Sequence, residues 1–208
     1  MIEIEDWGLI PYKESCLKQK LYVDEIQKGI RKSTLVLCSH PSVITIGRSG
    51  TQNNVLMTEK LLASLGVELY ETDRGGDVTL HNPGQLVGYT IFDLREFKTD
   101  LHWFLREIED SIIELLKFYD IQSSILDGLT GVWIDSKRKI CAIGLHCSRW
   151  ITSHGFALNV NNNLKEFEYI IPCGISDKQV TSIQMEVGNQ IDFKILEHRC
   201  TEIFERRF

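Results

Sequence analysis

The chain has 208 residues, of which 43% are hydrophobic and 25% charged, and its formal net charge is −6. This length and composition are typical of one globular domain whose core needs no disulfide or metal to fold, so we predict a single domain over residues 1–208. Without a basic block or an aromatic-rich basic stripe, the sequence argues against nucleic acid as a partner. The N-terminus lacks the features of a signal peptide, and no apolar run approaches the ~20 residues of a membrane span. We therefore expect a cytoplasmic protein with no membrane partner, whose six cysteines are free thiols.

The first predicted element is a helix over residues 16–32, where apolar side chains recur at helical intervals at Leu17, Leu21, Ile26 and Ile30. Gly29 falls near its end, as is usual for a helix C-terminus. The next segment, TLVLCSHPSVITIG, predicts two short strands separated by SHP, and VELYET predicts another. After a glycine-rich turn, LVGYTIFDL is apolar on both faces and is therefore predicted to be a central strand.

The second half of the chain begins with the strongest helical pattern, DLHWFLREIEDSIIELLKFYDI, with one wide apolar stripe and Thr99 or Asp100 as its cap. GVWID, KICAIGLHCS and WITSHGFALNV then predict strands joined by short polar turns. DFKILEHRCTEIFERRF predicts a final amphipathic helix. Clusters of strands with helices before, between and after them indicate an α+β fold, a mixed-sheet sandwich with flanking helices.

The first segment with chemical character is RGGDVTLHNPGQLVGY, residues 74–89. Gly75 and Gly76 allow a ligand to approach the backbone closely, because no Cβ stands in the way. The glycines alone are also consistent with a plain turn, but a plain turn does not need Arg74, Asp77 and His81 beside it. The segment matches neither dinucleotide nor P-loop fingerprints.

Two further candidates are residues whose ordinary interpretation is structural. Lys139 opens an apolar strand, where a lysine is usually a solvated end; the alternative is an ammonium group that stabilises a thiolate. His154 precedes another buried run and is either a hydrogen-bonded structural residue or an assisting catalytic group. Cys173 lies between Pro172 and Gly174, where it is either an apolar filler of a tight turn or a sulfur held at the mouth of a pocket.

Taken together, these segments resemble the octanoyltransferases of protein lipoylation, also called lipoyl(octanoyl) transferases. RGGDVTLHNPGQLVGY, KICAIGL, SHGFALNVNNNL, and PCGI followed by TSI match the signatures of that family in order. The 34-residue interval between Lys139 and Cys173 also agrees with the family's spacing. The resemblance implies the fold of the biotin and lipoate protein ligase catalytic domains.

The resemblance further implies a two-step acyl transfer without a metal, nucleotide or other cofactor. Cys173 would take the octanoyl group from acyl carrier protein as a thioester, and Lys139 would lower the pKa of the thiol and carry the proton. A lysine of a lipoyl domain would then accept the acyl group. The implied acceptors are the E2 subunits of 2-oxoacid dehydrogenases and the H protein of glycine cleavage.

By the same resemblance, small and polar residues from three segments would line the acyl site. Burial of the chain there would contribute about 0.8 kcal/mol per methylene. His81 would assist proton transfer or hold Lys139 through a hydrogen bond. The implied lining residues are Arg74, Gly75, Gly76, Asp77, Val78, Thr79, Leu80, His81, Ala142, Ile143, Gly144, Gly155, Phe156 and Ala157.

Two positions depart from the family pattern: Asn82 stands where many relatives have glycine, and Asn163 where they have aspartate. If position 82 requires a positive φ, asparagine tolerates it better than most residues. Basic residues that could meet an acidic carrier are Arg31, Lys32, Arg48, Lys137, Arg138 and Arg149.

Three alternatives remain open. A lipoate–protein ligase of the same fold would activate free acid with ATP and would need no cysteine nucleophile. An amidotransferase would move octanoyl between two lipoyl-type domains through a cysteine. A non-catalytic acyl-binding module would keep the pocket without a reactive thiol.

Overall fold

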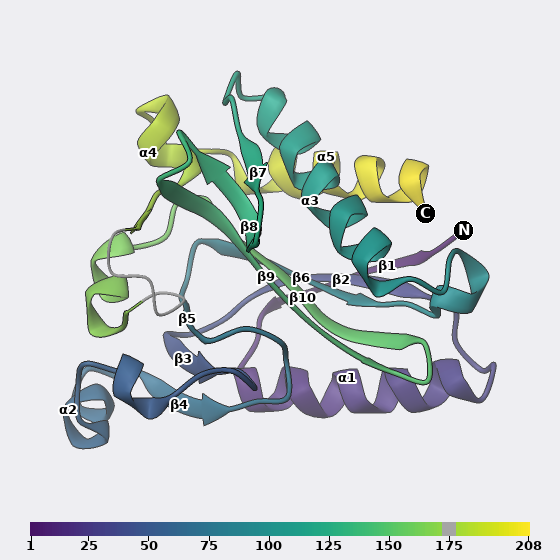
Figure 1. Ribbon diagram of the computed structural model, residues 1–208, viewed down its shortest axis with the longest axis horizontal. Helices are drawn as coiled ribbons and strands as arrows, with labels where there is room; N and C mark the ends of the chain where they lie inside the picture. Colours follow the sequence, from purple (N-terminus) through teal and green to yellow (C-terminus); the bar gives the residue numbers. More distant parts are fainter. Residues whose placement is uncertain (172–177) are drawn as a thin grey trace.

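The computed structural model describes residues 1–171 and 178–208, in which two β-sheets are covered by helices (Figure 1). The larger sheet has the strand order β1 (Glu3–Leu9), β2 (Thr34–Ser39), β6 (Gln85–Ile91), β10 (Ile151–Asn159), β9 (Arg138–Ser148), β8 (Leu129–Ile134) and β7 (Ser124–Leu126), and β11 (Gln179–Val180) also pairs with β9. The smaller sheet has the order β4 (Glu68–Glu71), β3 (Val43–Ile46) and β5 (Val78–His81). Both sheets mix parallel and antiparallel pairs, which confirms the predicted α+β class.

Helices cover both faces of the larger sheet (Figure 1). α1 (Tyr12–Gln27) lies on one face, and α3 (Leu101–Lys117) and α5 (Phe193–Arg207) lie on the other. The remaining helices are short: α2 (Glu59–Ser64), α4 (Ile183–Val187) and the 3₁₀ turns Gln52–Asn54, Leu94–Glu96 and Leu164–Tyr169. Among the described residues, no helix combines the length and apolar character that crossing a bilayer demands.

The strongly patterned elements agree with the sequence. Asp100 caps α3, since its side chain accepts the backbone N–H of Trp103, and the apolar stripe of α3 packs into the main core. The predicted central strand is β6, all of whose residues are buried between β2 and β10. The final helix is α5, and the strands predicted from GVWID, KICAIGLHCS and WITSHGFALNV are β8, β9 and β10.

The predicted apolar face of the first helix is largely wrong, since Ile26 is the one residue of the predicted four that is buried. α1 begins four residues earlier than expected, and Leu17, Leu21 and Ile30 are 62%, 53% and 72% exposed. Its buried face instead carries polar side chains, because Ser15 contacts the Tyr89 hydroxyl and Gln19 accepts the backbone N–H of His154. This face forms specific hydrogen bonds to the sheet, so hydrophobic spacing could not identify it.

Several elements were absent from the prediction: β1, β5, β7, β11, α2 and α4. Most of them have six residues or fewer, and so they show too little periodicity to stand out from turns. β5 matters most here, because it places part of the glycine-rich segment in the smaller sheet rather than in a hairpin turn.

Candidate active site

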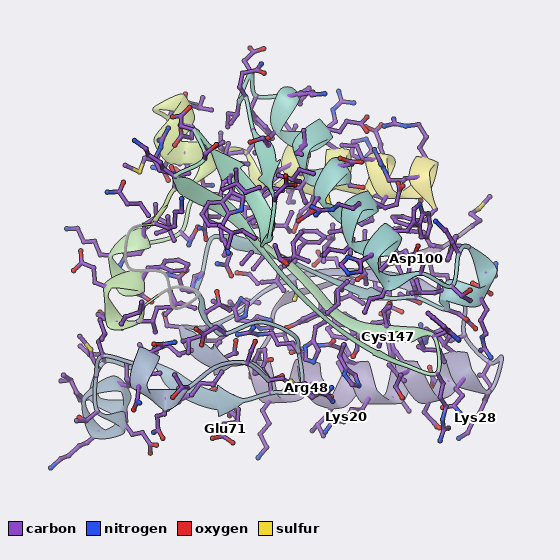
Figure 2. All side chains as sticks on the ribbon, in the orientation of Figure 1. Lys20, Lys28, Arg48, Glu71, Asp100 and Cys147 are labelled. Atoms are coloured by element: carbon purple, nitrogen blue, oxygen red, sulfur yellow. The ribbon has the colours of Figure 1, made fainter. Side chains whose placement is uncertain are left out.

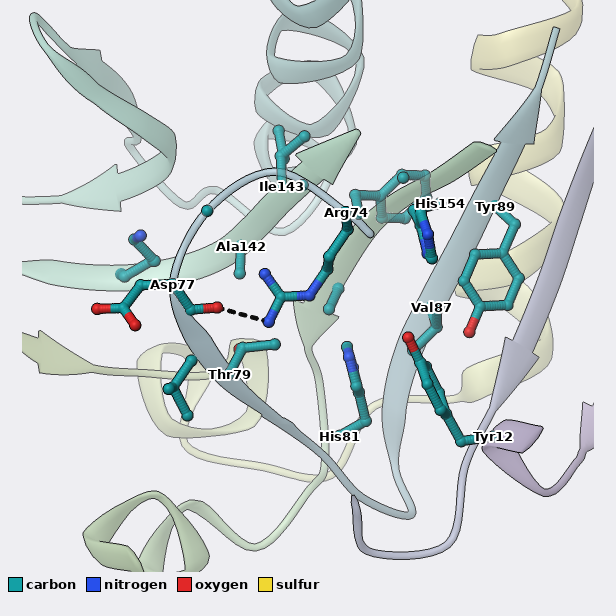
Figure 3. Close-up of a pocket in the computed structure, with 17 residues that line it drawn as sticks. Tyr12, Arg74, Asp77, Thr79, His81, Val87, Tyr89, Ala142, Ile143 and His154 are labelled. Atoms are coloured by element: carbon teal, nitrogen blue, oxygen red, sulfur yellow. Dashed lines mark hydrogen bonds between the residues drawn. The ribbon is translucent and has the colours of Figure 1, made fainter. Parts of the chain in front are cut away.

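A cavity of about 60 Å³, here called the inner cavity, lies where the segment 74–79 passes over β9 and β10 (Figure 3). β5 supplies His81 to its wall, β6 supplies Val87 and Tyr89, and α1 supplies Tyr12. Segments that are far apart in sequence therefore converge on one small space.

Arg74 fixes the segment over the cavity. Arg74 is only 8% exposed, and its guanidinium donates to the carbonyl of Thr45 at 2.7 Å and to the Thr45 hydroxyl at 2.9 Å. It also donates to the carbonyl of Asp77 at 2.7 Å, the bond drawn as a dashed line in Figure 3. The segment is also tied to the larger sheet, because the N–H of Gly75 donates to the carbonyl of Leu145 at 2.8 Å. Arg74 thus joins the two sheets at the cavity.

Glycines make this close approach possible. A Cβ at Gly144 would lie 2.7 Å from the carbonyl oxygen of Gly75, and a Cβ at Gly155 would lie 2.0 Å from that of Gly88. Neither position has a positive φ, so the requirement is for space rather than for an unusual backbone conformation. The floor of the cavity is therefore backbone.

A β-bulge turns Lys139 toward the cavity. Along β8 and β9 the register passes from Val132↔Cys141 to Trp133↔Lys139, which leaves Ile140 as an extra residue. In a regular strand residues 139 and 142 would face opposite sides of the sheet. Because of the bulge, Ile140 and Cys141 both enter the core, and Lys139 lines the cavity together with Ala142.

One aromatic and one acidic side chain contact the residues around this bulge. The Lys139 ammonium lies 4.6 Å from the centroid of the Trp133 ring, a cation–π contact with a fully buried indole. Glu109 of α3, also fully buried, accepts the backbone N–H of Gly131 at 2.9 Å, beyond the last ladder pair of β8 with β9. The sequence gives no sign of Glu109's contribution, because it lies inside an apolar helical stripe.

Side-chain amides determine which nitrogen of His81 carries the proton. Gln85 donates through Nε2 to the carbonyl of Leu80 and to Oδ1 of Asn159, whose own Nδ2 donates to the carbonyl of Thr181. Because both amides are oriented by carbonyl groups, Oε1 of Gln85 must face His81. His81 therefore donates from Nδ1 at 2.8 Å and presents an unprotonated Nε2. Figure 3 shows the ring pointing from β5 into the cavity.

This relay predicts a specific tautomer. At neutral pH, ¹⁵N NMR of His81 should show a protonated Nδ1 and an unprotonated Nε2. Asn159→Ala removes one of the two contacts that orient Gln85, so the ¹⁵N chemical shifts of the two ring nitrogens should move toward the averaged values of a mixture of tautomers. An Nε2-protonated ring in the parent protein would contradict the relay.

A second buried histidine stands behind the first. Nδ1 of His40 donates to the carbonyl of Ile10 at 2.7 Å, so its Nε2 accepts the hydroxyl of Tyr89 at 2.6 Å. Burial lowers the pKa of His40 to about 4 and that of His81 to about 3. Both rings also contact Tyr12, which stacks on His81 with a centroid separation of 6.0 Å.

These histidines predict acid sensitivity. A histidine in the unfolded chain has a pKa near 6.5. Below that pH it is protonated in the unfolded chain but stays neutral in the folded chain, so each of the two histidines lowers the free energy of unfolding by about 1.4 kcal/mol per pH unit. The stability is complete above about pH 6.5 and declines toward pH 4. Denaturant unfolding at several pH values should show this slope. His81→Gln should reduce this slope, because the unfolded variant no longer has this site for a proton.

His154 occupies a left-handed backbone conformation, with φ of 60°, at the other end of the cavity from Lys139. Its Nε2 lies 2.8 Å from Oδ1 of Asp73. Burial lowers the pKa of His154 despite this carboxylate. For Asp73, burial alone would raise the pKa, but the hydrogen bond with His154 lowers it on balance.

The structure brings most of the predicted site residues together. The residues that line the inner cavity as expected are Arg74, Gly76, Asp77, Val78, Thr79, His81, Lys139, Ala142, Ile143, Gly144, His154, Gly155, Phe156 and Ala157. Gly75 and Leu80 do not line it: Leu80 is fully buried in the core of the smaller sheet, and Gly75 borders a separate depression. Cys173 lies outside the described residues.

Three lining residues were not predicted. Val87 and Tyr89 lie two apart on β6, so the alternation of a strand recognised as central could have placed both on one face. Tyr12 precedes the segment predicted to be helical, and no sequence signal connected it with the site.

The two departures from the family pattern contact each other. Asn82 is buried without a positive φ, and its Nδ2 donates to the carbonyl of Asn163, while its Oδ1 accepts from Asn162. The side chain of Asn163 caps the following 3₁₀ turn by accepting the N–H of Lys165. Position 82 therefore does not require a positive φ. The side-chain amide of Asn82 instead joins two loops through hydrogen bonds.

Two of the six predicted basic residues form ion pairs within the chain. Arg31 pairs with Glu5 and Glu25, and Arg138 pairs with Asp135 and Glu186. Carboxylates thus neutralise two of the six candidates.

Comparison with known families decides the affiliation of this chain. A family model described as the lipoyl protein ligase A/B catalytic domain matches residues 11–205. The chain belongs to the lipoyl protein ligase A/B catalytic family. The resemblance inferred from the motifs is therefore confirmed at the level of the family.

Within the lipoyl protein ligase A/B family, curated relatives share 40–47% identity over most of this chain. A protein of Cytophaga hutchinsonii named octanoyltransferase is 43% identical, with 97% of this chain and 92% of that protein covered. A protein of Parabacteroides distasonis with the same name is 45% identical, with 98% and 96% covered.

Solved structures show the same fold at low identity. A lipoate-protein ligase A bound with ATP has a TM-score of 0.77 at 14% identity and covers 100% of this chain and 85% of its own. A biotin protein ligase from Aquifex aeolicus with biotin and ATP has a TM-score of 0.59 at 16% identity, with 99% and 69% covered. The predicted relationship to the biotin and lipoate ligase fold is confirmed.

Proposed function

We propose that this chain transfers an octanoyl group from acyl carrier protein to a lysine of lipoyl domains, through a thioester on Cys173, and that residues 1–208 act as one catalytic domain. It is an acyltransferase of protein lipoylation, since its curated relatives at 40–47% identity are named octanoyltransferases. The observation that carries the proposal in the structure is the inner cavity, where a narrow backbone-lined space has a lysine at one end.

The lining of the inner cavity suits a linear acyl chain, and a chain of eight carbons would have to widen the space of about 60 Å³ as it binds. Its walls include Val87, Ala142 and Phe156, and its floor is narrowed to backbone at the glycines. Each buried methylene contributes about 0.8 kcal/mol, so eight carbons provide ample binding energy without a charged partner.

The catalytic pair is proposed to be Cys173 and Lys139. Two observations on the flanking residues support it: Val180 of β11 pairs with Lys139, and the N–H of Thr181 donates to the Lys139 carbonyl at 3.0 Å. The chain therefore passes beside Lys139 seven residues after Cys173. The other five cysteines are poor nucleophiles, because burial raises the pKa of each thiol.

The chemistry proceeds by two acyl exchanges. The Cys173 thiolate forms a bond to the thioester carbonyl, the bond to the carrier sulfur breaks, and the carrier thiolate takes the proton that Lys139 holds. The acceptor amine then attacks the enzyme thioester, the Cys173–carbon bond breaks, and the amine proton returns to Lys139. The products are the octanoyl amide and the free enzyme.

His81 is proposed to orient Lys139 rather than to carry protons. Its buried ring, with a pKa of about 3, is a poor store for a proton at neutral pH. The relay through Gln85 instead leaves Nε2 as a hydrogen-bond acceptor in the cavity that Lys139 also lines.

Lipoyl-domain proteins are the acceptor class that the family affiliation supports. We extend this to E2 subunits of 2-oxoacid dehydrogenases and to the glycine cleavage H protein, with octanoyl-acyl carrier protein as the donor. The cytoplasm is the proposed location, since free thiols fit a reducing compartment.

Intact-mass measurement after mixing with octanoyl-acyl carrier protein, without ATP, tests this function. One octanoyl increment is expected on the parent protein and on Cys147→Ser, which removes a half-buried thiol, and none on Cys173→Ser. Labelling only by free octanoate with ATP would show a ligase, and labelling only by octanoylated H protein would show an amidotransferase. No adduct from any donor would show a binding module.

A further inference from the structure

A second cavity, here called the outer groove, adjoins the inner cavity and is far larger, at about 700 Å³. It lies between α1, the end of β4 with the turn that follows it, and the β9–β10 hairpin. Lys20, Arg48 and Glu71, which belong to its lining, lie near α1 and β4 in Figure 2. Tyr12 and His154 line both cavities, so these two side chains stand between them.

The two cavities follow one another along the same strands. On β9, Ala142 and Gly144 line the inner cavity, and His146 and Ser148 line the outer groove. These positions are two apart, so they lie on one face of the sheet. On β10, Gly155 pairs with Gly144 and Ala157 pairs with Ala142, and both line the inner cavity. Ile151 and Ser153 of the same strand line the outer groove.

The third wall has the same order. Arg74, Gly76 and Asp77 border the inner cavity, and the preceding residues 70–73 border the outer groove. A linear molecule that enters beside Lys139 and follows the strands therefore meets the pair Tyr12 and His154 before it reaches the groove.

Both side chains of this pair are held in place. The Tyr12 ring stacks on His81, and its hydroxyl donates to Oγ1 of Thr72 at 3.3 Å. His154 is fixed by Asp73 at its ring and by Gln19 at its backbone N–H. Both residues are buried, so neither moves aside without loss of these contacts.

We propose that Tyr12 and His154 form an end wall that sets the length of the acyl chain, and that the outer groove accepts the tail of a longer chain once this wall is opened. The inference rests on the proposed acyl transfer. Ala142 is the first residue after the bulge that faces the inner cavity, and His154 pairs three residues farther along β9, a distance of about 10 Å. An extended chain of eight carbons, with bonds of about 1.5 Å, spans about 9 Å.

Acyl-length competition tests the wall. Parent protein, Tyr12→Ala and Tyr12→Leu are each given octanoyl-, decanoyl- and dodecanoyl-acyl carrier protein, and acyl-enzyme formation is followed by intact mass. For the parent protein, the rate of acyl-enzyme formation should fall when the acyl chain is longer than eight carbons. Since each methylene that becomes buried is worth roughly fourfold, Tyr12→Ala should raise the dodecanoyl-to-octanoyl ratio by about tenfold or more. Tyr12→Leu, the milder change, should shift it in the same direction.

Two further variants locate the extra space. Leu17→Ala changes an exposed side chain of the same helix that borders neither cavity, so it should keep the parental ratio. Val23→Trp, combined with Tyr12→Ala, narrows the outer groove at one of its lining residues and should reduce the gain for dodecanoyl.

The outcomes separate this inference from the function beneath it. An octanoyl adduct on the parent, with a parental length ratio in folded Tyr12→Ala and Tyr12→Leu, would overturn the wall and leave the transferase intact. The same holds if Val23→Trp leaves the gain untouched, since the tail would then lie elsewhere. No adduct from any acyl donor would overturn the transferase itself.

Discussion

Lys139→Met should slow formation of the acyl-enzyme by about 10²–10⁴-fold, the range for loss of a positioned proton-transfer group. Methionine keeps most of the length and the apolar character of the side chain, which passes close to Gly131. It removes the ammonium that is proposed to stabilise the Cys173 thiolate and to carry the proton. Stopped mixing with octanoyl-acyl carrier protein, followed by intact mass, measures the rate.

The stability of Lys139→Met should change little. The contact with Trp133 is worth about 1–2 kcal/mol, and the methionine sulfur also packs well against an aromatic ring. Lys137→Met is the matched control, because Lys137 lies two residues before Lys139 and is exposed. Equal rates for Lys139→Met and the parent protein would remove the assigned role of Lys139.

Gly155→Ala should cost the protein more stability than any other small change in the cavity. The added Cβ would lie 2.0 Å from the carbonyl oxygen of Gly88 and 3.1 Å from the backbone nitrogen of Thr90. Backbone cannot rotate away as a flexible side chain can, so β6 and β10 must separate. The free energy of unfolding should fall by about 3 kcal/mol, at the upper end of the cost of overpacking.

The control for this change is Gly75→Ala, whose Cβ would lie 3.2 Å from its nearest neighbour and at a φ that alanine tolerates. Its effect on denaturant unfolding should be less than half that of Gly155→Ala. A stability of Gly155→Ala within 0.5 kcal/mol of the parent, a typical surface effect, would show that the strands are not packed as closely as described.

The sequence predicted what depends on long periodic patterns and on motif chemistry. α3 is identified by its stripe and its Asp100 cap, and β6 by two faces that are both mostly apolar. The resemblance to octanoyltransferases also named fourteen residues from three separate segments that line one cavity in the structure.

The remaining features depend on contacts between distant segments. Tyr12 joins the cavity only because α1 turns polar side chains such as Ser15 and Gln19 toward the sheet. Lys139 faces the cavity because the bulge interrupts the alternation of side chains along β9. Regular alternation would have placed Lys139 on the same face of the sheet as Cys141, which is buried in the core. The tautomer of His81 depends on Gln85 and Asn159, which come from two different strands.

The pairing of Cys173 with Lys139 is the central claim, and the alkylation of thiols at different pH values tests it most directly. Peptide mass mapping follows Cys173 beside the other five cysteines in the same sample. Cys173 should react fastest and titrate with a pKa below the usual value near 8.5, and Lys139→Met should raise that pKa while the other five thiols stay unchanged. A Cys173 that titrates like its neighbours, with no response to Lys139→Met, would contradict the account.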